Sequence, residues 1–450
     1  MSILQGIVIS FGLLFSILLL VTVVVFITEK QLRAVWVSLV FLIIIPLPFF
    51  LSLIFSGVFS FWYNSILLSF TGALFVAFLY NPKRNKFAPT TPAVQHDERN
   101  TMFSRRELQS NTREFREYYK LFPTHIHLDN NWRQKPGLMS PDSVFYNPVL
   151  FAAAEASFKT IGWLGKHING KPADKKTDIS PDSLTRFVKS WMQKQGFADV
   201  GVASMKPYHY YHTKGRGEHY NTPVTMRYPY GIALTMEMSE KVMQTAPKAS
   251  AIMESAEKYL SSGVPAVQLA AFLRELGYNA QAHIDGNYEV VCPLVARDAG
   301  LGEIGRMGLL MSPKQGPRIR IAVITTDAPL VVDNPSKVAQ SMIEFCHFCK
   351  KCATICPGRA IPSGDREIED GALRWKIDSE ACFSYWAVSG TDCGRCMTVC
   401  PYAHGANFLH SFIRFGIQHS LLFRRLAVVL DDLFYGKKPK SRPLLSWMKV

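Results

Sequence analysis

The stretch CHFCKKCATICP, residues Cys346–Pro357, places four cysteines at spacings of two, two and three residues and closes on a proline. A second stretch, CGRCMTVCP at Cys393–Pro401, repeats this pattern in shortened form, with Cys382 upstream. The spacing C-x2-C-x2-C-x3-C-P is typical of bacterial iron–sulfur ligation, because short turns let successive thiolates converge on the corners of one cube. The two stretches therefore predict two [4Fe–4S] clusters.

The ligand sets of the two clusters are expected to cross between the stretches. The proline turns the chain away, so that the last cysteine of each motif reaches the other cube. One cluster is expected on Cys346, Cys349, Cys352 and Cys400, and the other on Cys356, Cys382, Cys393 and Cys396. Zinc is the alternative ligand for paired C-x2-C motifs, but zinc ribbons need neither the extra cysteines at these offsets nor the prolines.

The other properties of the cysteines exclude a disulfide scaffold. All nine lie at or after Cys292 in a chain of 450 residues. Disulfide scaffolds are usually short secreted chains, whereas clustered cysteines in a long chain favour metal or cluster ligation. Cys292 is left over in the apolar stretch VVCPLV, and we expect an inert buried thiol there.

The first eighty residues are nearly free of charge. Three apolar runs, 3–27, 33–57 and 61–80, each reach the length of about 20 residues that a membrane-spanning helix needs. A signal peptide would have a single apolar region of only about 7–15 residues. We therefore expect three transmembrane helices, the second of them kinked at Pro46 and Pro48.

The basic residues indicate how these helices are oriented. Lys30 and Arg33 lie in the first connection, and Lys83, Arg84 and Lys86 follow the third run. Basic loops stay on the cytoplasmic side. We expect a multi-pass protein of the cell inner membrane whose large C-terminal part faces the cytoplasm. The net charge of +15 fits an anionic membrane surface, and since no Lys/Arg run is interleaved with aromatic residues, nucleic acid is an unlikely partner by composition.

The rest of the chain has a mixed α/β pattern. An amphipathic helix from Ser183 precedes a short strand, and further strands begin at Tyr230 and Ile319. The segment from Lys248 to Ala280 is interpreted as two helices separated by a Gly-Val-Pro break. This alternation predicts helices packed on a sheet. The polar stretch SRREL at Ser104–Leu108 contains a twin arginine, but no apolar region follows it, which argues against an export signal.

Three long segments resemble one known family. CFSYWAVSGTDCGRCMTVCPYAHGANFLH, from Cys382, resembles the second cluster region of the corrinoid-dependent reductive dehalogenases. DAGLGEIGRMGLLMSPKQGPRIRIAVITTDAPL, from Asp298, and MQTAPKASAIMESAEKY, from Met243, resemble that family's cobalamin-binding core. The resemblance covers roughly residues 185–435. It implies a nitroreductase-like α+β core that binds a base-off corrinoid, followed by a bacterial ferredoxin-like 2×[4Fe–4S] module.

The expected organisation of the chain follows from this resemblance. It comprises a transmembrane anchor over 1–80, a polar linker over 81–118, a corrinoid-binding catalytic core over 119–335, the cluster module over 336–410 and a C-terminal helical segment over 411–450. The corrinoid histidine signature D-x-H-x-x-G is absent, which fits cobalamin bound without a histidine ligand.

The resemblance also implies site residues. Tyr259, twelve residues after Pro247 in TAP, matches the family's proton donor, and Arg320 in GPRIR matches the supporting cation. The third position falls on Asn287 when counted back from AGLG and on Asp285 when counted forward from Tyr259. Residues implied to bind the cofactor are Gly300, Gly302, Gly305, Arg306 and Gly316.

Three functions are compatible with these observations. The first is a membrane-anchored reductive dehalogenase that replaces carbon–halogen by carbon–hydrogen in an organohalide, with quinol or ferredoxin as electron donor. Respiratory members of the family are typically exported and docked to a separate small membrane protein, whereas here the helices precede the enzyme in one chain. The second function is an epoxyqueuosine reductase-like enzyme that acts on tRNA, with Asp285 as its acid. The third is a non-enzymatic iron–sulfur electron-transfer protein.

Overall fold

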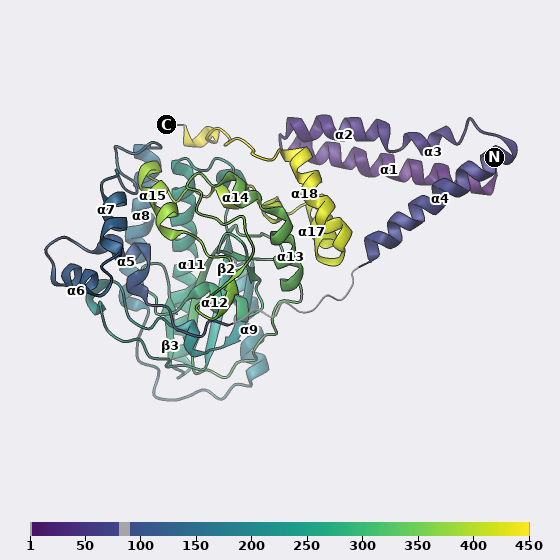
Figure 1. Ribbon diagram of the computed structural model, residues 1–450. Helices are drawn as coiled ribbons and strands as arrows, with labels where there is room; N and C mark the ends of the chain where they lie inside the picture. Colours follow the sequence, from purple (N-terminus) through teal and green to yellow (C-terminus); the bar gives the residue numbers. More distant parts are fainter. Residues whose placement is uncertain (1, 81–90, 450) are drawn as a thin grey trace. The chain divides into compact units, whose positions relative to one another are not determined.

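The computed structural model describes residues 2–80 and 91–449, which form two compact units (Figure 1). One unit combines the N-terminal helices with residues 406–439. The other holds the rest of the described chain, 91–405 and 440–449. The segment 411–450, expected to be a single C-terminal element, is thus divided between the two units. Its last residues return to the globular unit, where Arg442 N–H donates to the carbonyl of Gln244.

The N-terminal unit begins with apolar helices. They are α1 (Ile3–Thr28), α2 (Leu32–Ile44), the short α3 (Leu47–Leu51) and α4 (Gly57–Leu79). Three segments, Ile3–Thr28, Leu32–Leu51 and Gly57–Leu79, are long and apolar enough to cross a membrane. The second is interrupted at Pro46, as expected, since proline cannot continue the hydrogen-bond ladder of α2. Lys83, Arg84 and Lys86, on which the predicted orientation partly depends, lie outside the described residues.

Two C-terminal helices, α17 (Phe408–His419) and α18 (Leu421–Tyr435), complete this unit. The ring of Phe26 in α1 stacks on Phe434 of α18 with centroids 5.2 Å apart. Arg33, at the start of α2, donates from Nε to the carbonyl of Leu433 at 2.8 Å. These contacts hold α17 and α18 to the end of the α1–α2 hairpin.

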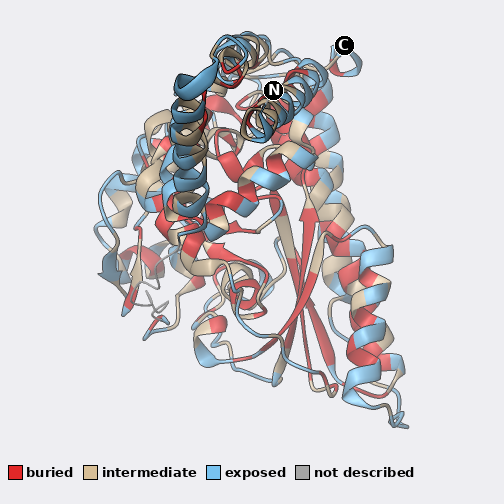
Figure 2. Ribbon diagram, turned by 90° about the vertical axis from the view of Figure 1, so that its right-hand side faces the viewer, coloured by how far each residue is buried: buried red, intermediate tan, exposed pale blue. Residues whose placement is uncertain are grey.

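A four-stranded antiparallel sheet is the centre of the globular unit. Its order is β1 (Asp199–Ser204), β2 (Tyr230–Glu237), β6 (Ile319–Thr326) and β3 (Ala280–His283). The predicted strands from Tyr230 and Ile319 are therefore confirmed. Figure 2 shows that this sheet is almost wholly buried. Buried residues alternate between two cores: Ile232 and Leu234 face one side, and Ala233 faces the other.

Helices cover both faces of the sheet. The larger core packs α9 (Pro181–Lys194) and α11 (Ala249–Glu275) against β2 and β6. On the opposite face, Val295 and Ala296 of α12 (Cys292–Asp298) pack against the sheet. Outside α11 lies α8 (Pro148–Leu164). This two-sided α+β arrangement agrees with the predicted fold class.

Helix α11 differs from its prediction as two helices. It continues through the Gly-Val-Pro stretch, with Pro265 inside it. A Cβ on Gly263 would lie 2.9 Å from Cδ1 of Ile161, so the glycine lets α8 approach closely. Burial of this helix–helix interface outweighs the cost of one missing backbone hydrogen bond, and tertiary packing thereby overrides the local break signal.

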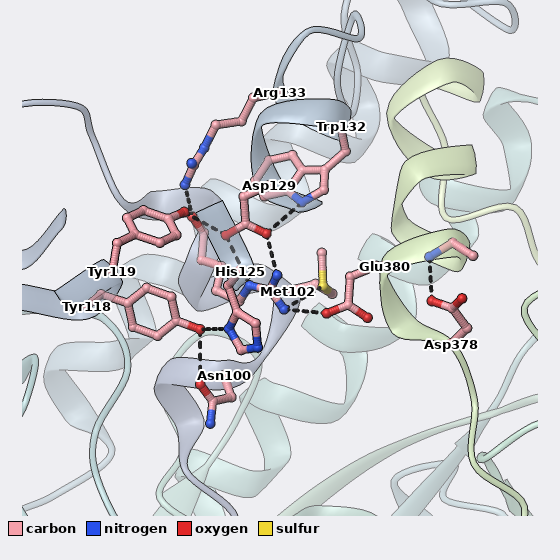
Figure 3. A network of polar contacts seen from close by, with 12 residues as sticks. Asn100, Met102, Tyr118, Tyr119, His125, Asp129, Trp132, Arg133, Asp378 and Glu380 are labelled. Atoms are coloured by element: carbon pink, nitrogen blue, oxygen red, sulfur yellow. Dashed lines mark hydrogen bonds and ion pairs between the residues drawn. The ribbon is translucent and has the colours of Figure 1, made fainter. Parts of the chain in front are cut away.

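Residues 98–133, part of which was expected to be a polar linker, are folded into the globular unit. They form α5 (Met102–Glu107), α6 (Arg113–Leu121) and α7 (His125–Arg133). Figure 3 shows the buried network at their centre, where Asp129 accepts hydrogen bonds from Arg105, Tyr119 and Trp132. Arg105 also donates to Glu380 at 2.7 Å. The polar side chains that suggested a linker are therefore paired inside the fold. Arg105, one of the two arginines in SRREL, is a structural residue.

The cysteine motifs lie on short elements that follow the sheet. The first spans α13 (Ala339–Cys349) and α14 (Lys351–Ile355), and the second follows α15 (Ser379–Ser389) and includes α16 (Arg395–Thr398). Between them is the hairpin of β7 (Glu367–Glu369) and β8 (Ala372–Arg374). A second small hairpin, β4 (Glu303–Ile304) with β5 (Leu310–Met311), precedes β6. The remaining short helix, α10 (Glu240–Met243), leads into α11.

Candidate functional site

Helix α11 and strand β6 bring the two principal predicted residues together. Tyr259 lies on α11, and Arg320 lies near the start of β6. The guanidinium carbon of Arg320 is 5.0 Å from the centroid of the Tyr259 ring, within cation–π range. The phenol hydroxyl has no hydrogen-bond partner among the residues that the structure describes. The site thus presents a half-buried phenol whose hydroxyl is available to a ligand.

The electrostatics of the site keep this phenol protonated. Burial raises the pKa of Tyr259 to about 12, although the charge of Arg320 opposes the rise. The charges of Asp285, Asp392 and Cys292 raise the pKa of Tyr259 further. A protonated phenol next to a fixed cation can act as an acid, because the cation stabilises the phenolate that is left.

Arg320 is fixed by two partners that the sequence did not indicate. Its Nη2 donates to Ser255 Oγ at 2.6 Å and to Asp392 Oδ2 at 3.0 Å. Ser255 also donates to the same oxygen of Asp392. Since Ser255 precedes Tyr259 by one helical turn, both side chains lie on one face of α11. Asp392 is detectable in the sequence only as an acidic residue directly before Cys393.

Two buried polar atoms at this site remain unpaired within the described residues. They are Nε of Arg320 and Oδ1 of Asp392. Buried polar atoms are normally paired, and exceptions point to a functional site or to an absent ligand. Together with the free phenol hydroxyl, these atoms indicate a place where another molecule contributes hydrogen-bonding groups.

The turn after β3 separates the two alternatives for the third residue. Asp285 is half-buried, and its charge acts on both Tyr259 and Arg320. Burial raises the pKa of Asp285, while Arg216 and Arg320 oppose that rise. The side chain of Asn287 is instead turned toward Gly165, since a Cβ on that glycine would lie 2.6 Å from Asn287 Oδ1. The structure thus brings the charge of Asp285 to the Tyr259 site, and Asn287 Nδ2 donates to the carbonyl of Asp285 at 3.5 Å.

Arg216 is a second cation near Asp285 that the sequence did not single out. Its guanidinium carbon lies 4.8 Å from the ring centroid of Tyr288. Its Nε pairs with the buried carboxylate of Glu98 at 3.2 Å. Cys292, predicted to be an inert thiol, is half-buried, and burial raises its pKa to about 12. The thiol therefore stays protonated at neutral pH.

The predicted cofactor-binding glycines face protein atoms closely. A Cβ on Gly302 would lie 2.0 Å from the carbonyl oxygen of Met311, and one on Gly316 would lie 2.8 Å from Cβ of Tyr402. Gly300 and Gly305 are equally crowded, at 2.3 Å from Asn334 O and from Met311 Sδ. The structure thus gives all four a packing role in their segment. Gly302 and Gly305 also border a cavity of about 780 Å³, whose wall includes Arg297, Lys337, Arg366 and Arg374.

Arg306 supports the first cysteine motif. It is fully buried, and its Nε donates to the carbonyl of Cys346 at 3.0 Å. Its Nη1 donates to the carbonyls of Pro362 at 2.8 Å and Gly364 at 2.7 Å. These bonds fix the backbone around Cys346, so the described contacts of Arg306 are structural.

Electrostatic interactions connect the cysteines of the two motifs, and they include one between Cys396 and Cys352. Cys400 lies within electrostatic reach of Cys346, Cys349 and Cys352. Cys356 lies in the same way near Cys382, Cys393 and Cys396. Left-handed backbone at Lys350 and Cys393 makes the tight turns inside the motifs. No three His, Cys, Asp or Glu side chains of the described chain are placed to hold a single metal ion.

Comparison with known proteins identifies the cluster module and the fold. Residues 345–404 match the family model described as a 4Fe-4S dicluster domain. The tetrachloroethene reductive dehalogenase of Sulfurospirillum multivorans is 37% identical over 216 residues, which are 46% of this chain and 42% of that protein. The tetrachloroethene reductive dehalogenase of Desulfitobacterium hafniense is 36% identical over 202 residues, or 42% and 36% of the two chains.

A solved structure shows the same fold. The catabolic reductive dehalogenase NpRdhA, in complex with 3-bromo-4-hydroxybenzoic acid, has a TM-score of 0.64 and 23% identity and covers 80% of this chain and 49% of that one. The predicted resemblance to reductive dehalogenases is therefore confirmed in sequence and in fold. This chain spans less than half the length of the curated relatives it matches.

Proposed function

We propose that this protein is a corrinoid-dependent reductive dehalogenase held at a membrane by its N-terminal helices. The reaction would replace a carbon–halogen bond by a carbon–hydrogen bond. It consumes two electrons and one proton and releases halide. The observation that carries the proposal is the pairing of a free, protonated phenol, Tyr259, with a fixed cation, Arg320, beside a dicluster domain.

Tyr259 would supply the proton. Its hydroxyl is free of protein partners within the described chain, and burial keeps it protonated with a pKa of about 12. Proton transfer to the substrate carbon would leave a phenolate whose ring centroid is 5.0 Å from the guanidinium carbon of Arg320, which is anchored by Ser255 and Asp392. An anchored counter-charge does not have to reorganise during the transfer, which lowers the barrier.

The residues around the site are suited to a corrinoid. The unpaired Nε of Arg320 and Oδ1 of Asp392 are orphaned polar atoms that a bound molecule can satisfy. The 780 Å³ cavity is lined by four basic residues, Arg297, Lys337, Arg366 and Arg374, and by two acidic ones, Asp298 and Glu303; this excess of positive charge would suit the anionic phosphate of the cofactor's nucleotide tail. When bound, the corrinoid supplies the cobalt redox chemistry that cleaves the carbon–halogen bond. His283 is not available as a cofactor ligand, because its two ring nitrogens bond Thr325 and Glu289 N–H.

Two [4Fe–4S] clusters would deliver the electrons. The crossed grouping of Cys400 with the first motif and Cys356 with the second is the ligand set that two adjacent cubes need. Cys393, a ligand of one proposed cluster, directly follows Asp392, which anchors Arg320. Quinol or ferredoxin would be the external donor.

The N-terminal helices would place the protein in the cell inner membrane. Three helices reach the length that a bilayer requires. Lys30 and Arg33 in the α1–α2 connection favour a cytoplasmic location for that connection and, after two further crossings, for the globular unit. A reporter fused after Lys86 is expected to be cytoplasmic. A periplasmic signal would reverse this orientation.

One observation bears on the tRNA-modifying alternative. The epoxyqueuosine reductase of Synechococcus sp. is 28% identical over 120 residues, which are 24% of this chain and 33% of that protein. The proximity of Asp285 to Tyr259 gives the site a second potential acid. The dehalogenase relatives match more of the chain at higher identity, and they favour the first function.

Anaerobically purified protein provides the test. We expect about eight iron atoms per chain, equal sulfide and one cobalt. Reductive dehalogenation should then be assayed with tetrachloroethene and 3-bromo-4-hydroxybenzoic acid, the compounds named for the relatives. Conversion of epoxyqueuosine tRNA without dehalogenation would favour the alternative. Iron without cobalt would leave only an electron-transfer protein.

A further inference from the structure

Helices α17 and α18 have an inverted distribution of side chains. Their exposed positions are mostly large and apolar: Phe408, Phe412, Phe415, Leu422, Leu426, Val429 and Leu433. Their buried positions include charged and polar residues: His410, Arg414, Ser420, Arg424 and Asp431. A helix that faces water shows the opposite arrangement, with an apolar stripe toward the core. The outer face of this helix pair is therefore built for an apolar surrounding.

The exposed apolar residues form a continuous stripe on each helix. On α17, Phe408, Phe412 and Phe415 are spaced by four and three residues. On α18, Leu422, Leu426 and Val429 repeat that spacing. Residues at such spacing lie on one side of an α-helix. Exposed apolar patches of this kind mark sites of contact with a partner or with lipid.

The inner side of the pair is held to the end of α1 by a polar cluster. Glu29, directly after α1, accepts from Asn407 Nδ2 at 2.8 Å and pairs with His410 Nε2 at 2.7 Å. Tyr435 donates to the other oxygen of Glu29 at 2.9 Å. These polar contacts attach α17 and α18 to the loop between α1 and α2. This loop is at one end of helices long enough to cross a membrane.

That position corresponds to the boundary between lipid tails and water. With 12 and 15 residues, α17 and α18 are too short to cross a bilayer, which needs about 20. An amphipathic helix of this kind lies in the plane of the interface, with its apolar face buried to a depth of about 5–10 Å. The location and the length of the pair therefore favour the membrane surface over a transmembrane position.

Charge and shape favour anionic phospholipid. The exposed charged residues of 406–439 are Arg425, Lys437 and Lys438, whereas Arg414, Arg424 and Asp431 are buried. A groove of about 650 Å³ runs between α4 and α18, with apolar walls from Ala73, Ala77, Leu421 and Leu422. Arg425 and Tyr80 also line it. An acyl chain suits the walls, and a headgroup phosphate suits the guanidinium.

We propose that α17 and α18 form a second membrane-binding element that lies in the surface layer of the bilayer, with their apolar stripes among the lipids and Arg425 at an anionic phospholipid headgroup. The inference rests on the proposed membrane crossing of α1–α4, and it does not depend on dehalogenase activity. The polar cluster at Glu29 would connect this surface element to the transmembrane helices.

Photo-crosslinking in the full-length protein tests the proposal. Benzoylphenylalanine is placed at Phe415 or Val429, and the purified protein is reconstituted into vesicles of phosphatidylcholine with phosphatidylglycerol. Phe187 on α9 is the matched control, because it is 50% exposed, as Phe415 is, but lies in the globular unit. Phe70 on α4 is the positive control for membrane insertion. We expect lipid adducts at Phe415, Val429 and Phe70, several-fold above those at Phe187.

The outcomes separate this inference from the proposed anchor. Lipid adducts at Phe70, but only peptide adducts or none at Phe415 and Val429, would overturn the surface element and leave the anchor standing. Absence of lipid adducts at Phe70 would overturn both. A benzoylphenylalanine at Leu422 should capture phosphatidylglycerol in preference to phosphatidylcholine. This preference should fall in Arg425→Gln and persist in Arg425→Lys, and equal capture in all three would exclude the headgroup contact.

Discussion

Arg320 Nη2 lies 3.0 Å from Asp392 Oδ2, and Asp392 immediately precedes Cys393. The cation next to the phenol of Tyr259 is therefore held by the loop that carries a predicted cluster ligand. Ser255, which bonds both Arg320 and Asp392, connects the same pair to helix α11. Through these contacts, the position of Arg320 beside Tyr259 depends on the loop that contains Asp392 and Cys393.

Asp392→Asn tests this dependence. The substitution keeps the shape of the side chain and removes the charge that fixes Arg320. A charged hydrogen bond contributes about 1.5–3 kcal/mol, so turnover should fall about tenfold to a hundredfold. Iron and sulfide content and the cluster EPR signals should remain normal. If these signals were lost along with activity, Asp392 would be supporting the cluster rather than Arg320.

Tyr259→Phe tests the proton donor. The variant loses one hydroxyl and little volume, so folding and cofactor content should be retained. Loss of a general acid typically lowers the rate by about 10²–10⁴-fold. Tyr278→Phe is the matched control, since that hydroxyl bonds only the carbonyl of Thr177 at 2.8 Å. Near-normal turnover in Tyr259→Phe would remove Tyr259 from the mechanism.

The pH dependence of turnover should report the charges around Tyr259. The phenol is the proton-donating form, so the rate should fall as the pH rises through its pKa of about 12. Asp285 raises this pKa, so Asp285→Asn should move the alkaline limb to lower pH. Arg320 lowers the pKa, and Arg320→Gln should move the limb to higher pH while also slowing turnover. The turnover rate, measured from neutral to strongly alkaline pH, will show whether each variant moves the alkaline limb in the expected direction.

Asn287→Ala is the control for Asp285→Asn, because it changes a neighbouring side chain without removing a charge. It should leave the pH profile unchanged. If Asp285→Asn abolished activity while Tyr259→Phe kept it, the acid would be the carboxyl group, and the tRNA-modifying alternative would gain weight.

The contrast between Tyr259 and Asp392 shows what the sequence could predict. Tyr259 and Arg320 stand in long segments that resemble the family, and these segments indicated both residues. Asp392 has its role only through a contact with Arg320, 72 positions away in the chain. Counting along the chain did not distinguish Asn287 from Asp285, because it does not give the path of the turn after β3.

Burial and pairing explain the remaining differences. The segment around Arg105 is polar and was interpreted as a linker, yet its charges are paired with Asp129 and Glu380 inside the fold. Glu380 lies 275 residues away, beyond the reach of any local pattern. The Gly-Val-Pro stretch is a break signal that packing against α8 overrides. Regular spacing of cysteines, by contrast, is a local property, and it identified the dicluster domain directly.

The crossed ligand sets can be tested with two cysteine variants. Cys400→Ala should remove a ligand from the cube held by the first motif, although Cys400 lies in the second. Cys356→Ala should damage the other cube. EPR of the reduced protein should show loss of a different signal in each variant, and Cys292→Ala should keep both. If Cys400→Ala and Cys396→Ala removed the same signal, the crossed assignment would be refuted.

The twin arginine offers a last test, because its two members differ sharply in environment. The side chain of Arg105 is 2% exposed and pairs with the fully buried Asp129, whereas Arg106 is exposed. Arg105→Ala leaves a buried carboxylate without its counter-charge, which typically costs about 3–5 kcal/mol. Arg106→Ala should change stability by no more than about 0.5 kcal/mol. Thermal unfolding, followed through loss of iron–sulfur absorbance, should therefore occur at lower temperature only in Arg105→Ala. The absorbance is a suitable reporter because Glu380, the other partner of Arg105, lies two residues before the predicted ligand Cys382.

The outcome expected of an export signal is different. Both variants would then change the location of the protein, and neither would change the stability of the folded chain.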